Sequence, residues 1–169
     1  IYRQIQSGAA KPEEISLEYL AGFFDGEGSI SIGLNSPKNT PRSKNPNHTL
    51  HVGAGNTNPM IIKYLYDKYG GSFFTRDAKG NQRKVWQWGI SSRRAEKFLQ
   101  ELQPFLRMKQ PQANLALAFM EHKIGKKGPT QVSAAEIEIR EKYRHELITL
   151  NGRALRQKAQ NGTQIQPMV

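Results

Sequence analysis

The sequence predicts an α+β fold in which a four-stranded antiparallel sheet carries helices on one of its faces. Three observations predict it: four short segments alternate between apolar and polar residues, they fall into two pairs, and helical patterns lie between and after them. The chain has 169 residues, enough for one domain with a real core. We expect a single domain over residues 1–150 and a basic, polar tail over residues 151–169.

A first helix is predicted to run to about Phe24. It follows an acidic segment, and Ser16 can cap it, because acids suit the first turn and a serine hydroxyl accepts from a free backbone N–H. Gly22 and Gly26 lie four residues apart and share one face if the helix extends that far. A glycine inside a helix costs about 1 kcal/mol relative to alanine, so we expect a closely packed partner helix to compensate.

The predicted strands place apolar side chains at every second position. In the last of them, Trp86, Trp88 and Ile90 share one face, which favours core packing of both tryptophans over the alternative, stacking on nucleic-acid bases. Residues 36–47 contain three prolines and several basic residues, so they form a loop rather than a central strand. The strand segments are residues 29–35, 50–54, 73–77 and 85–91, and they form two hairpins.

Helical patterns fill the remaining segments. Asn58 and Pro59 suit the cap and the first turn of a helix that ends at Gly70. Two more helices are predicted over residues 93–102 and 109–124. Ser133 and Glu136 form a capping box. The helix that this box opens has an apolar stripe of Ile139, Tyr143, Leu147 and Leu150.

The charge balance points to a polyanionic partner. Lys and Arg number 25 against 14 Asp and Glu, a formal net charge of +11, which suits nucleic acid. There is no apolar run of membrane-spanning length and no evident signal peptide, so we expect a soluble intracellular protein of the cytoplasm or an organelle matrix. Cysteine is absent, which excludes disulfides and thiolate metal sites.

Residues 20–28 read Leu-Ala-Gly-Phe-Phe-Asp-Gly-Glu-Gly, and this motif occurs once. Taken alone, its last four residues also fit a polar turn between a helix and a strand. Further segments follow in order: Asn-Thr-Asn-Pro at 56–59, Trp-Gln-Trp-Gly-Ile at 86–90 and Gln-Pro-Phe-Leu-Arg-Met-Lys at 103–109. With these segments the chain resembles the LAGLIDADG homing endonucleases, in particular the single-motif type encoded within introns. The resemblance covers residues 15–124 approximately.

This resemblance implies the mixed α/β LAGLIDADG homing-endonuclease fold, whose curved sheet lies in the major groove of double-stranded DNA. Two subunits would join through their motif helices into a homodimer that covers a long pseudo-palindromic target. The interface would include Leu20, Gly22, Phe23 and Gly26. The implied activity is a double-strand break with short 3′ overhangs, which promotes mobility of the host intron.

The family's catalytic positions carry over one by one. The eighth motif position is Glu27, the expected metal ligand, with the Gly26 carbonyl beside it; these hard oxygen ligands suit Mg²⁺, and Ca²⁺ is expected to support binding without cleavage. Lys109 aligns with the family's pocket lysine and would stabilise phosphate charge or influence the proton of the attacking water. Asn56 stands in for a glutamine that positions water. Asp25 is expected to be structural.

The open face of the sheet and its loop tips are predicted to bind DNA through base edges and phosphates. A merely solvated face is the alternative. The predicted DNA-binding residues are Ser31, Asn35, Lys38, Arg42, Lys44, His48, His51, Thr75, Arg76, Lys79, Arg83, Lys84 and Gln87.

Three other functions stay open at this point. Related LAGLIDADG proteins act as RNA maturases that assist intron splicing, and a basic surface suits RNA equally well. A DNA-binding protein without catalysis could keep the motif helix for dimerisation alone. A ribosome-associated protein would explain the charge but not the motif.

Overall fold

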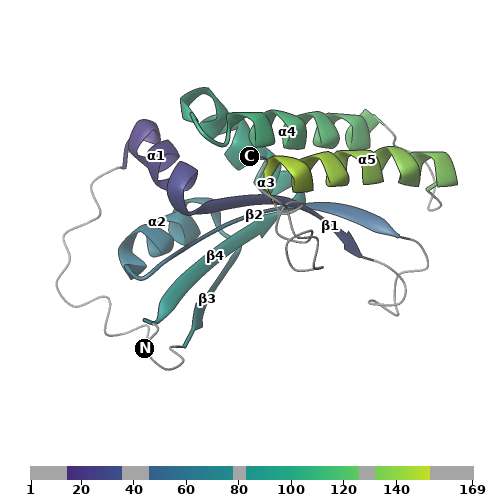
Figure 1. Ribbon diagram of the computed structural model, residues 1–169. Helices are drawn as coiled ribbons and strands as arrows, with labels where there is room; N and C mark the ends of the chain where they lie inside the picture. Colours follow the sequence, from purple (N-terminus) through teal and green to yellow (C-terminus); the bar gives the residue numbers. More distant parts are fainter. Residues whose placement is uncertain (1–14, 36–45, 78–82, 126–131, 153–169) are drawn as a thin grey trace, which may run out of the picture.

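Four antiparallel strands form one sheet in the order β1-β2-β4-β3 (Figure 1). The computed structural model describes residues 15–35, 46–77, 83–125 and 132–152. The strands are β1 (Gly28–Asn35), β2 (Asn47–Asn56), β3 (Ser72–Arg76) and β4 (Val85–Ser91). β1 pairs with β2 and β3 with β4, as the two predicted hairpins require, and β2 joins the hairpins by pairing with β4. The predicted sheet is confirmed.

Helices account for most of the remaining described residues. They are α1 (Leu17–Glu27), α2 (Pro59–Tyr69), α3 (Ser92–Leu102), the 3₁₀ turn η1 (Gln103–Phe105), α4 (Gln110–Gly125) and α5 (Ala134–Leu150). Ser16, Asn58 and Ser133 cap α1, α2 and α5, each side-chain oxygen accepting from a first-turn N–H group at 2.9–3.3 Å. Within the described ranges, no helix is long and apolar enough to cross a membrane.

The helix α1 is one turn longer than the sequence predicts. It reaches Glu27 rather than Phe24, and the N–H group of Gly28 still donates to the Phe24 carbonyl. Gly28 then passes directly into β1, and a Cβ at this position would lie 2.4 Å from the Phe24 ring. A glycine at residue 28 therefore allows a helix and a strand to follow each other without a loop.

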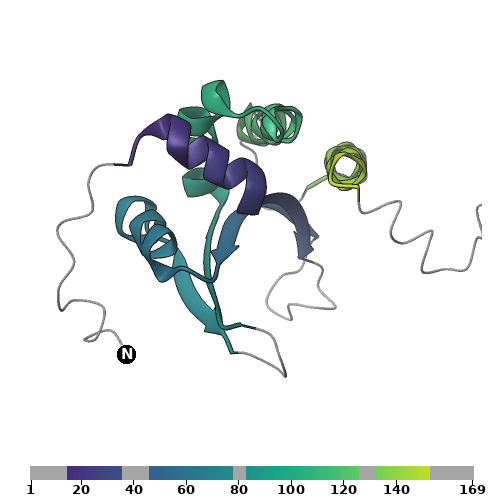
Figure 2. The same ribbon diagram turned by 60° about the vertical axis from the view of Figure 1, so that its left-hand side comes forward.

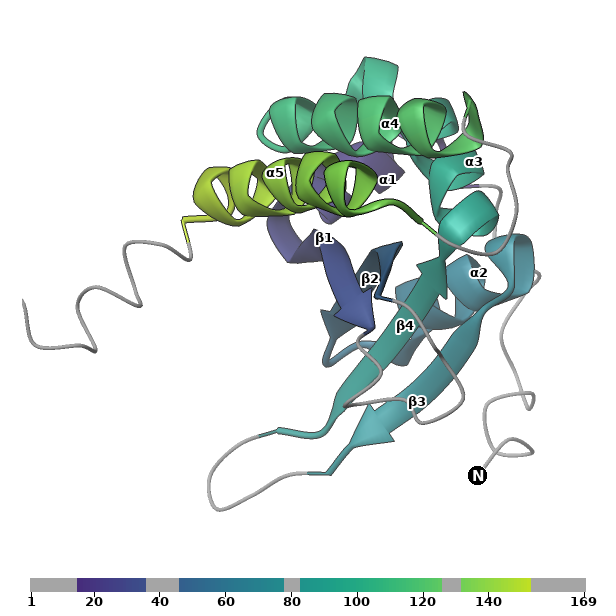
Figure 3. The same cartoon turned by 90° about the vertical axis from the view of Figure 1, so that its right-hand side faces the viewer.

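The helices cover one face of the sheet and leave the other open (Figures 1 and 3). α4 and α5 contact β1, α3 contacts β2 and β4, and α2 packs mainly on β4. Trp88 is only 2% exposed, and its ring lies 5.2 Å from that of Phe98, which also contacts Phe24 at 5.2 Å. Trp86 lies on the same side and stacks on Phe73. The predicted core packing of both tryptophans is confirmed.

The predicted apolar stripe of α5 is only partly correct. Leu147 is buried and Tyr143 packs against the core, whereas Ile139 and Leu150 are 38% and 41% exposed. The inner face of α5 instead carries Glu136 and Arg140 together with Tyr143 and Leu147. These four residues are three or four positions apart, so they share one side of the helix. Glu136 accepts from Arg140 Nε at 2.7 Å and lies 3.0 Å from His122 Nε2, so both charges are buried as partners.

Candidate active site and nucleic-acid interface

Glu27 stands at the meeting point of the motif helix and the open face of the sheet. It is the last residue of α1, and its side chain is exposed. The final carbonyls of a helix lack partners within it and carry partial negative charge, which would attract a cation beside this carboxylate. Glu27 lines a cavity of about 460 Å³ together with Gly55, Phe74 and Gln87. The cavity opens on the sheet face that no helix covers.

Asp25, two residues earlier, points the other way and has a structural role. Its carboxylate accepts from three consecutive backbone N–H groups, those of Arg107 and Lys109 at 2.8 Å and of Met108 at 3.1 Å. Burial of this group, which is 7% exposed, raises its pKa, but the three donors and the Lys109 ammonium outweigh burial, so the pKa of Asp25 lies below its usual range. The carboxylate ties the end of α1 to the segment that leads into α4.

This connection brings Lys109 to the end of the motif helix. Its ammonium donates to the backbone carbonyl of Asp25, within the last turn of α1 that also carries Glu27. Lys109, which lies 82 positions after Glu27 in the sequence, thereby adds positive charge next to the carboxyl-terminal end of α1. Glu27 and Lys109, two of the three predicted catalytic residues, therefore lie at the same end of α1, one as its last residue and the other through its bond to Asp25.

Among the described residues, none covers the outer side of α1 (Figure 2). Outside their own helix and chain neighbours, no atom of the described residues lies within 4 Å of a Cβ built on Gly22 or Gly26. Tyr19, on the same side, is 63% exposed, and Phe23 is half-buried. Leu20 is fully buried in the core of its own chain, so its prediction as an interface residue is wrong: two positions from Gly22, it lies about 160° away around the helix and faces inward.

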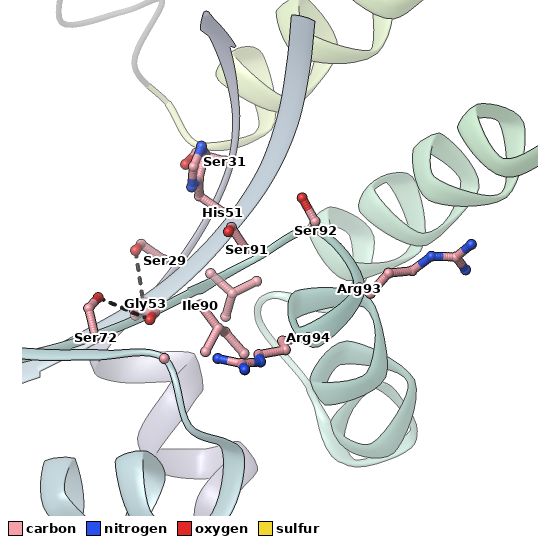
Figure 4. A pocket seen from close by; sticks show the side chains of 13 residues that line it. Ser29, Ser31, His51, Gly53, Ser72, Ile90, Ser91, Ser92, Arg93 and Arg94 are labelled. Atoms are coloured by element: carbon pink, nitrogen blue, oxygen red, sulfur yellow. Dashed lines mark hydrogen bonds between the residues drawn. The ribbon is translucent and has the colours of Figure 1, made fainter. Parts of the chain in front are cut away.

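The open face of the sheet is organised in rows that run across the strands. The register places Ser31, His51 and Ser91 side by side, then Ser29, Gly53, Gly89 and Ser72, then Gly55, Gln87 and Phe74. The first two rows line a cavity of about 620 Å³ that reaches Arg94 at the start of α3 (Figure 4). Small residues dominate its floor, and hydroxyl groups surround it.

Two serines at this cavity donate to backbone carbonyls within the sheet. Ser29 Oγ donates to the Gly53 carbonyl at 3.2 Å and Ser72 Oγ to the Gly89 carbonyl at 3.1 Å (Figure 4). A Cβ at Gly33 would lie 3.1 Å from the His51 ring, so the glycine provides room for it. Partial desolvation lowers the pKa of His51, which keeps the imidazole neutral at neutral pH and able to both donate and accept.

Comparisons with known proteins agree with this geometry. The DNA endonuclease I-CreI of Chlamydomonas reinhardtii is 34% identical over 106 residues, a match that spans 62% of this chain and 62% of the relative. The solved structure of I-CvuI with DNA superposes with a TM-score of 0.61 at 19% identity, over 79% of this chain and 80% of that chain. The I-LtrWI LAGLIDADG homing endonuclease bound to target DNA superposes with a TM-score of 0.63 at 13% identity, over 86% of this chain and 50% of that chain.

The chain has the fold of the LAGLIDADG homing endonucleases and is similar in sequence to one of them, I-CreI. No family model matches it. The solved structures are less than 20% identical to this chain and establish the shared fold. The sequence match to I-CreI covers less than two thirds of that protein. The LAGLIDADG-like motif, residues 20–28, forms the end of α1 and the first residue of β1, which is where Glu27 and the open sheet meet.

Several predicted DNA-binding residues share the open face of the sheet. Ser31, His51, Arg76 and Gln87 lie there by strand alternation, and Asn35 lies at the exposed end of β1. Arg83 and Lys84 lead into β4, where the Lys84 ammonium is 5.2 Å from the centre of the Trp86 ring. Lys38, Arg42, Lys44 and Lys79 lie outside the described residues, as does the tail beyond Gly152.

Two of the predicted DNA-binding residues, His48 and Thr75, do not lie on the open face of the sheet. His48 is 1% exposed, and its Nε2 lies 2.6 Å from Glu141 of α5, on the helix side of the sheet. The alternation of β2 already puts it in line with Leu50 and Val52, so the pattern alone could have excluded it. Thr75 is opposite Trp86 in the register and therefore lies on the helix side too, although it is exposed.

Asn56 has a structural partner. Its side-chain oxygen accepts from the backbone N–H of Asn58 at 2.8 Å, while Asn58 caps α2. The two asparagines thus shape the turn between β2 and α2. The amide nitrogen of Asn56 and the second lone pair of its oxygen could still serve the predicted role in positioning water.

Sequence reasoning missed Ser29, Ser72, Ser91 and Phe74 on the open face. The first follows from the alternation of its strand, since Ser29 and Ser31 share a side. The others depend on which residue of β4 stands opposite which residue of its neighbours, and a register shift of one residue reverses every side chain.

Proposed function

We propose that this chain is one subunit of a homodimeric homing endonuclease that makes a double-strand break in a long pseudo-palindromic DNA target. Cleavage at such a site would promote mobility of the host intron, with short 3′ overhangs as the product. The observation that carries this proposal is the position of Glu27: an exposed carboxylate at the end of a helix whose outer side is bare, next to an open sheet face. The relative I-CreI is named a DNA endonuclease.

The donor set at the end of α1 fits a hard divalent cation such as Mg²⁺. Glu27 offers carboxylate oxygens and Gly26 a backbone carbonyl, the ligand types that Mg²⁺ and Ca²⁺ prefer. In the described part of one chain, no cluster of three or more His, Asp or Glu side chains could hold a metal ion. Pairing of two α1 helices through their bare sides would bring a second Glu27 to the site. The ion would activate water and offset charge on the phosphate oxygens.

The residues of the chain would divide the remaining work. Glu27 holds and orients the hydrolytic centre, while the Lys109 ammonium, fixed at the Asp25 carbonyl, lowers the energy of the extra negative charge on the phosphate. The serines, His51 and Gln87 of the open face would bind base edges and phosphates and so choose the sequence. Chemistry and recognition would thus belong to neighbouring but different elements.

Cleavage selection from a randomised double-stranded DNA library tests this proposal. We expect the protein to recover one pseudo-palindromic sequence with Mg²⁺, to bind it without cleavage in Ca²⁺, and to leave it intact when metal is omitted. Glu27→Gln should abolish cleavage and retain binding of that sequence. Glu18→Gln is the matched control, because it makes the same change at the other end of α1 and should cleave normally. Specific binding without Mg²⁺-dependent cleavage would instead identify a DNA-binding protein without nuclease activity.

A further inference from the structure

Phe74 is a large apolar side chain on an otherwise polar surface. It is 51% exposed and lies on the open face of β3, directly opposite Gln87 of β4. Its neighbour Phe73 points to the other side, where its ring lies 5.7 Å from that of Tyr66 and 5.4 Å from that of Trp86. The two adjacent phenylalanines therefore have different roles: Phe73 packs the aromatic core, and Phe74 presents its ring to whatever occupies the open face.

The floor beside Phe74 has few side chains that could cover this ring. Gln87 and Gly55 lie next to Phe74 in the same row across the strands. The neighbouring row contains Gly89 and Gly53. At Gly53 even a Cβ would lie 2.8 Å from the Trp88 carbonyl. Because the glycines have no side chains, a ligand can approach the backbone of the sheet closely here. The Phe74 ring projects from the sheet beside them.

We propose that Phe74 is a specificity-determining residue that recognises the 5-methyl group of a thymine in the major groove. A phenyl ring makes no hydrogen bond of use to a base edge, and the thymine methyl is the apolar group that the major groove presents. Gln87 lies directly opposite Phe74 and carries a side-chain amide, which can form two hydrogen bonds with adenine N6 and N7. Phe74 and Gln87 together therefore suit the recognition of A·T base pairs. This inference rests on the proposed DNA-cleaving function.

The position of Phe74 limits which base pairs it can contact. Phe74, Gln87 and Gly55 form one row, and Glu27 precedes the first residue of β1 at the far end of that row, in the same cavity. Strands lie about 4.8 Å apart, so three spacings separate the ends of the row by roughly 15 Å. With a rise of about 3.4 Å per base pair, this distance corresponds to about four to five base pairs between the thymine and the scissile phosphate in each half-site.

Replacing thymine by deoxyuridine in the DNA sequence recovered by the library selection tests this inference. The exchange removes one methyl group and leaves every hydrogen-bonding group unchanged. For the wild-type protein, we expect deoxyuridine at one position of a single half-site to weaken binding in Ca²⁺ about fourfold, the value of one buried methyl. For Phe74→Ala the same exchange should have no effect, and the selection should lose its thymine preference there. Phe74→Leu should keep the methyl sensitivity, since leucine is also apolar.

The control variant is Met60→Ala, which removes another exposed apolar side chain from α2 and should keep full sensitivity to deoxyuridine. Unchanged thermal unfolding of Phe74→Ala would show that the fold is intact. If the wild type cleaves a specific sequence but no thymine shows a methyl effect that Phe74→Ala abolishes, this inference is wrong and the proposed function stands. If the wild type neither binds nor cleaves a specific sequence, both fail.

Discussion

Asp25 illustrates how two acids, two positions apart, take different roles within one motif. Its carboxylate is buried and satisfied by three backbone donors, whereas Glu27 is exposed and faces the sheet cavity. Residue type alone does not separate them, because both are carboxylates at a helix end. Their roles differ because the segment 107–109, remote in sequence, donates its backbone N–H groups to the Asp25 carboxylate.

Asp25→Asn should lower the free energy of unfolding by about 2 kcal/mol at neutral pH, because a neutral amide accepts fewer of the three N–H groups. The lowered pKa of Asp25 sets the pH dependence: its contribution is complete above the unfolded pKa of about 3.9 and is lost as the pH falls through the folded pKa. Urea unfolding of both proteins should therefore converge in acid. Asp67→Asn, at an exposed residue of α2 paired with Lys63, should change little. Equal stability of Asp25→Asn and wild type at pH 7 would contradict the structural role.

Gly28→Ala should destabilise the protein by about 1–3 kcal/mol, the usual cost of overpacking. The added Cβ would lie 2.4 Å from both the ring and the carbonyl oxygen of Phe24, a residue that is itself fully buried. Gly55→Ala is the matched control, since a Cβ there meets nothing closer than 3.5 Å. Thermal unfolding measures both, and an equal effect of the two substitutions would rule out this steric explanation.

At the scale of elements, α1 has two unlike sides. Leu20 and Phe24 are buried among the core residues of their own chain, while Gly22 and Gly26 lie on the side that other described elements leave bare. Two glycines in an exposed helix reduce its stability, so their presence favours a close backbone contact made by a second molecule.

Changing both Gly22 and Gly26 to Ala separates helix stability from assembly. Each substitution should favour the isolated helix by about 1 kcal/mol, because alanine has the higher helix propensity and meets no clash within the chain. The added methyl groups should nevertheless weaken the dimer, which sedimentation equilibrium measures, and reduce cleavage accordingly. A double variant that dimerises as tightly as the wild type would place the interface elsewhere.

The sequence predicts the elements better than it predicts their inner faces. Period-two alternation located all four strands, and capping residues located the starts of α1, α2 and α5. The inner face of α5 was only half predicted. Glu136 and Arg140 pair four residues apart on the same helix, but Glu136 is also contacted by His122 of α4. His48 is a similar case, buried with Glu141 of α5 as its partner. The contacts of both histidines are tertiary, and the local pattern does not contain them.

For the whole molecule, the arrangement of the charge matters more than its total. The proposed recognition surface combines a smooth, uncharged floor with basic residues towards its margins, including Arg76 on β3 and Arg94 at the start of α3. Phosphates would be held at the margins while base edges meet the floor.

Arg76→Ala should reduce the dependence of DNA affinity on salt. The slope of log affinity against log salt should fall by about one for each phosphate that the variant subunit no longer neutralises. Lys142→Ala is the control that removes the same charge, because Lys142 lies on α5 beside Glu138 and away from the open face. Binding titrations from low to moderate salt measure the slopes. Parallel slopes for Arg76→Ala and the wild type would show that this arginine binds no phosphate.

The hydrogen bonds of Asp25 have an evolutionary consequence. They fix the Glu27 helix end and Lys109 to each other through the backbone of residues 107–109, without using any side chain of the open sheet face. If the proposed function holds, substitutions that change the specificity of the face would therefore leave the proposed hydrolytic residues in place. A lineage that follows a changing target sequence could then alter its specificity by small steps, each of which begins from a working nuclease.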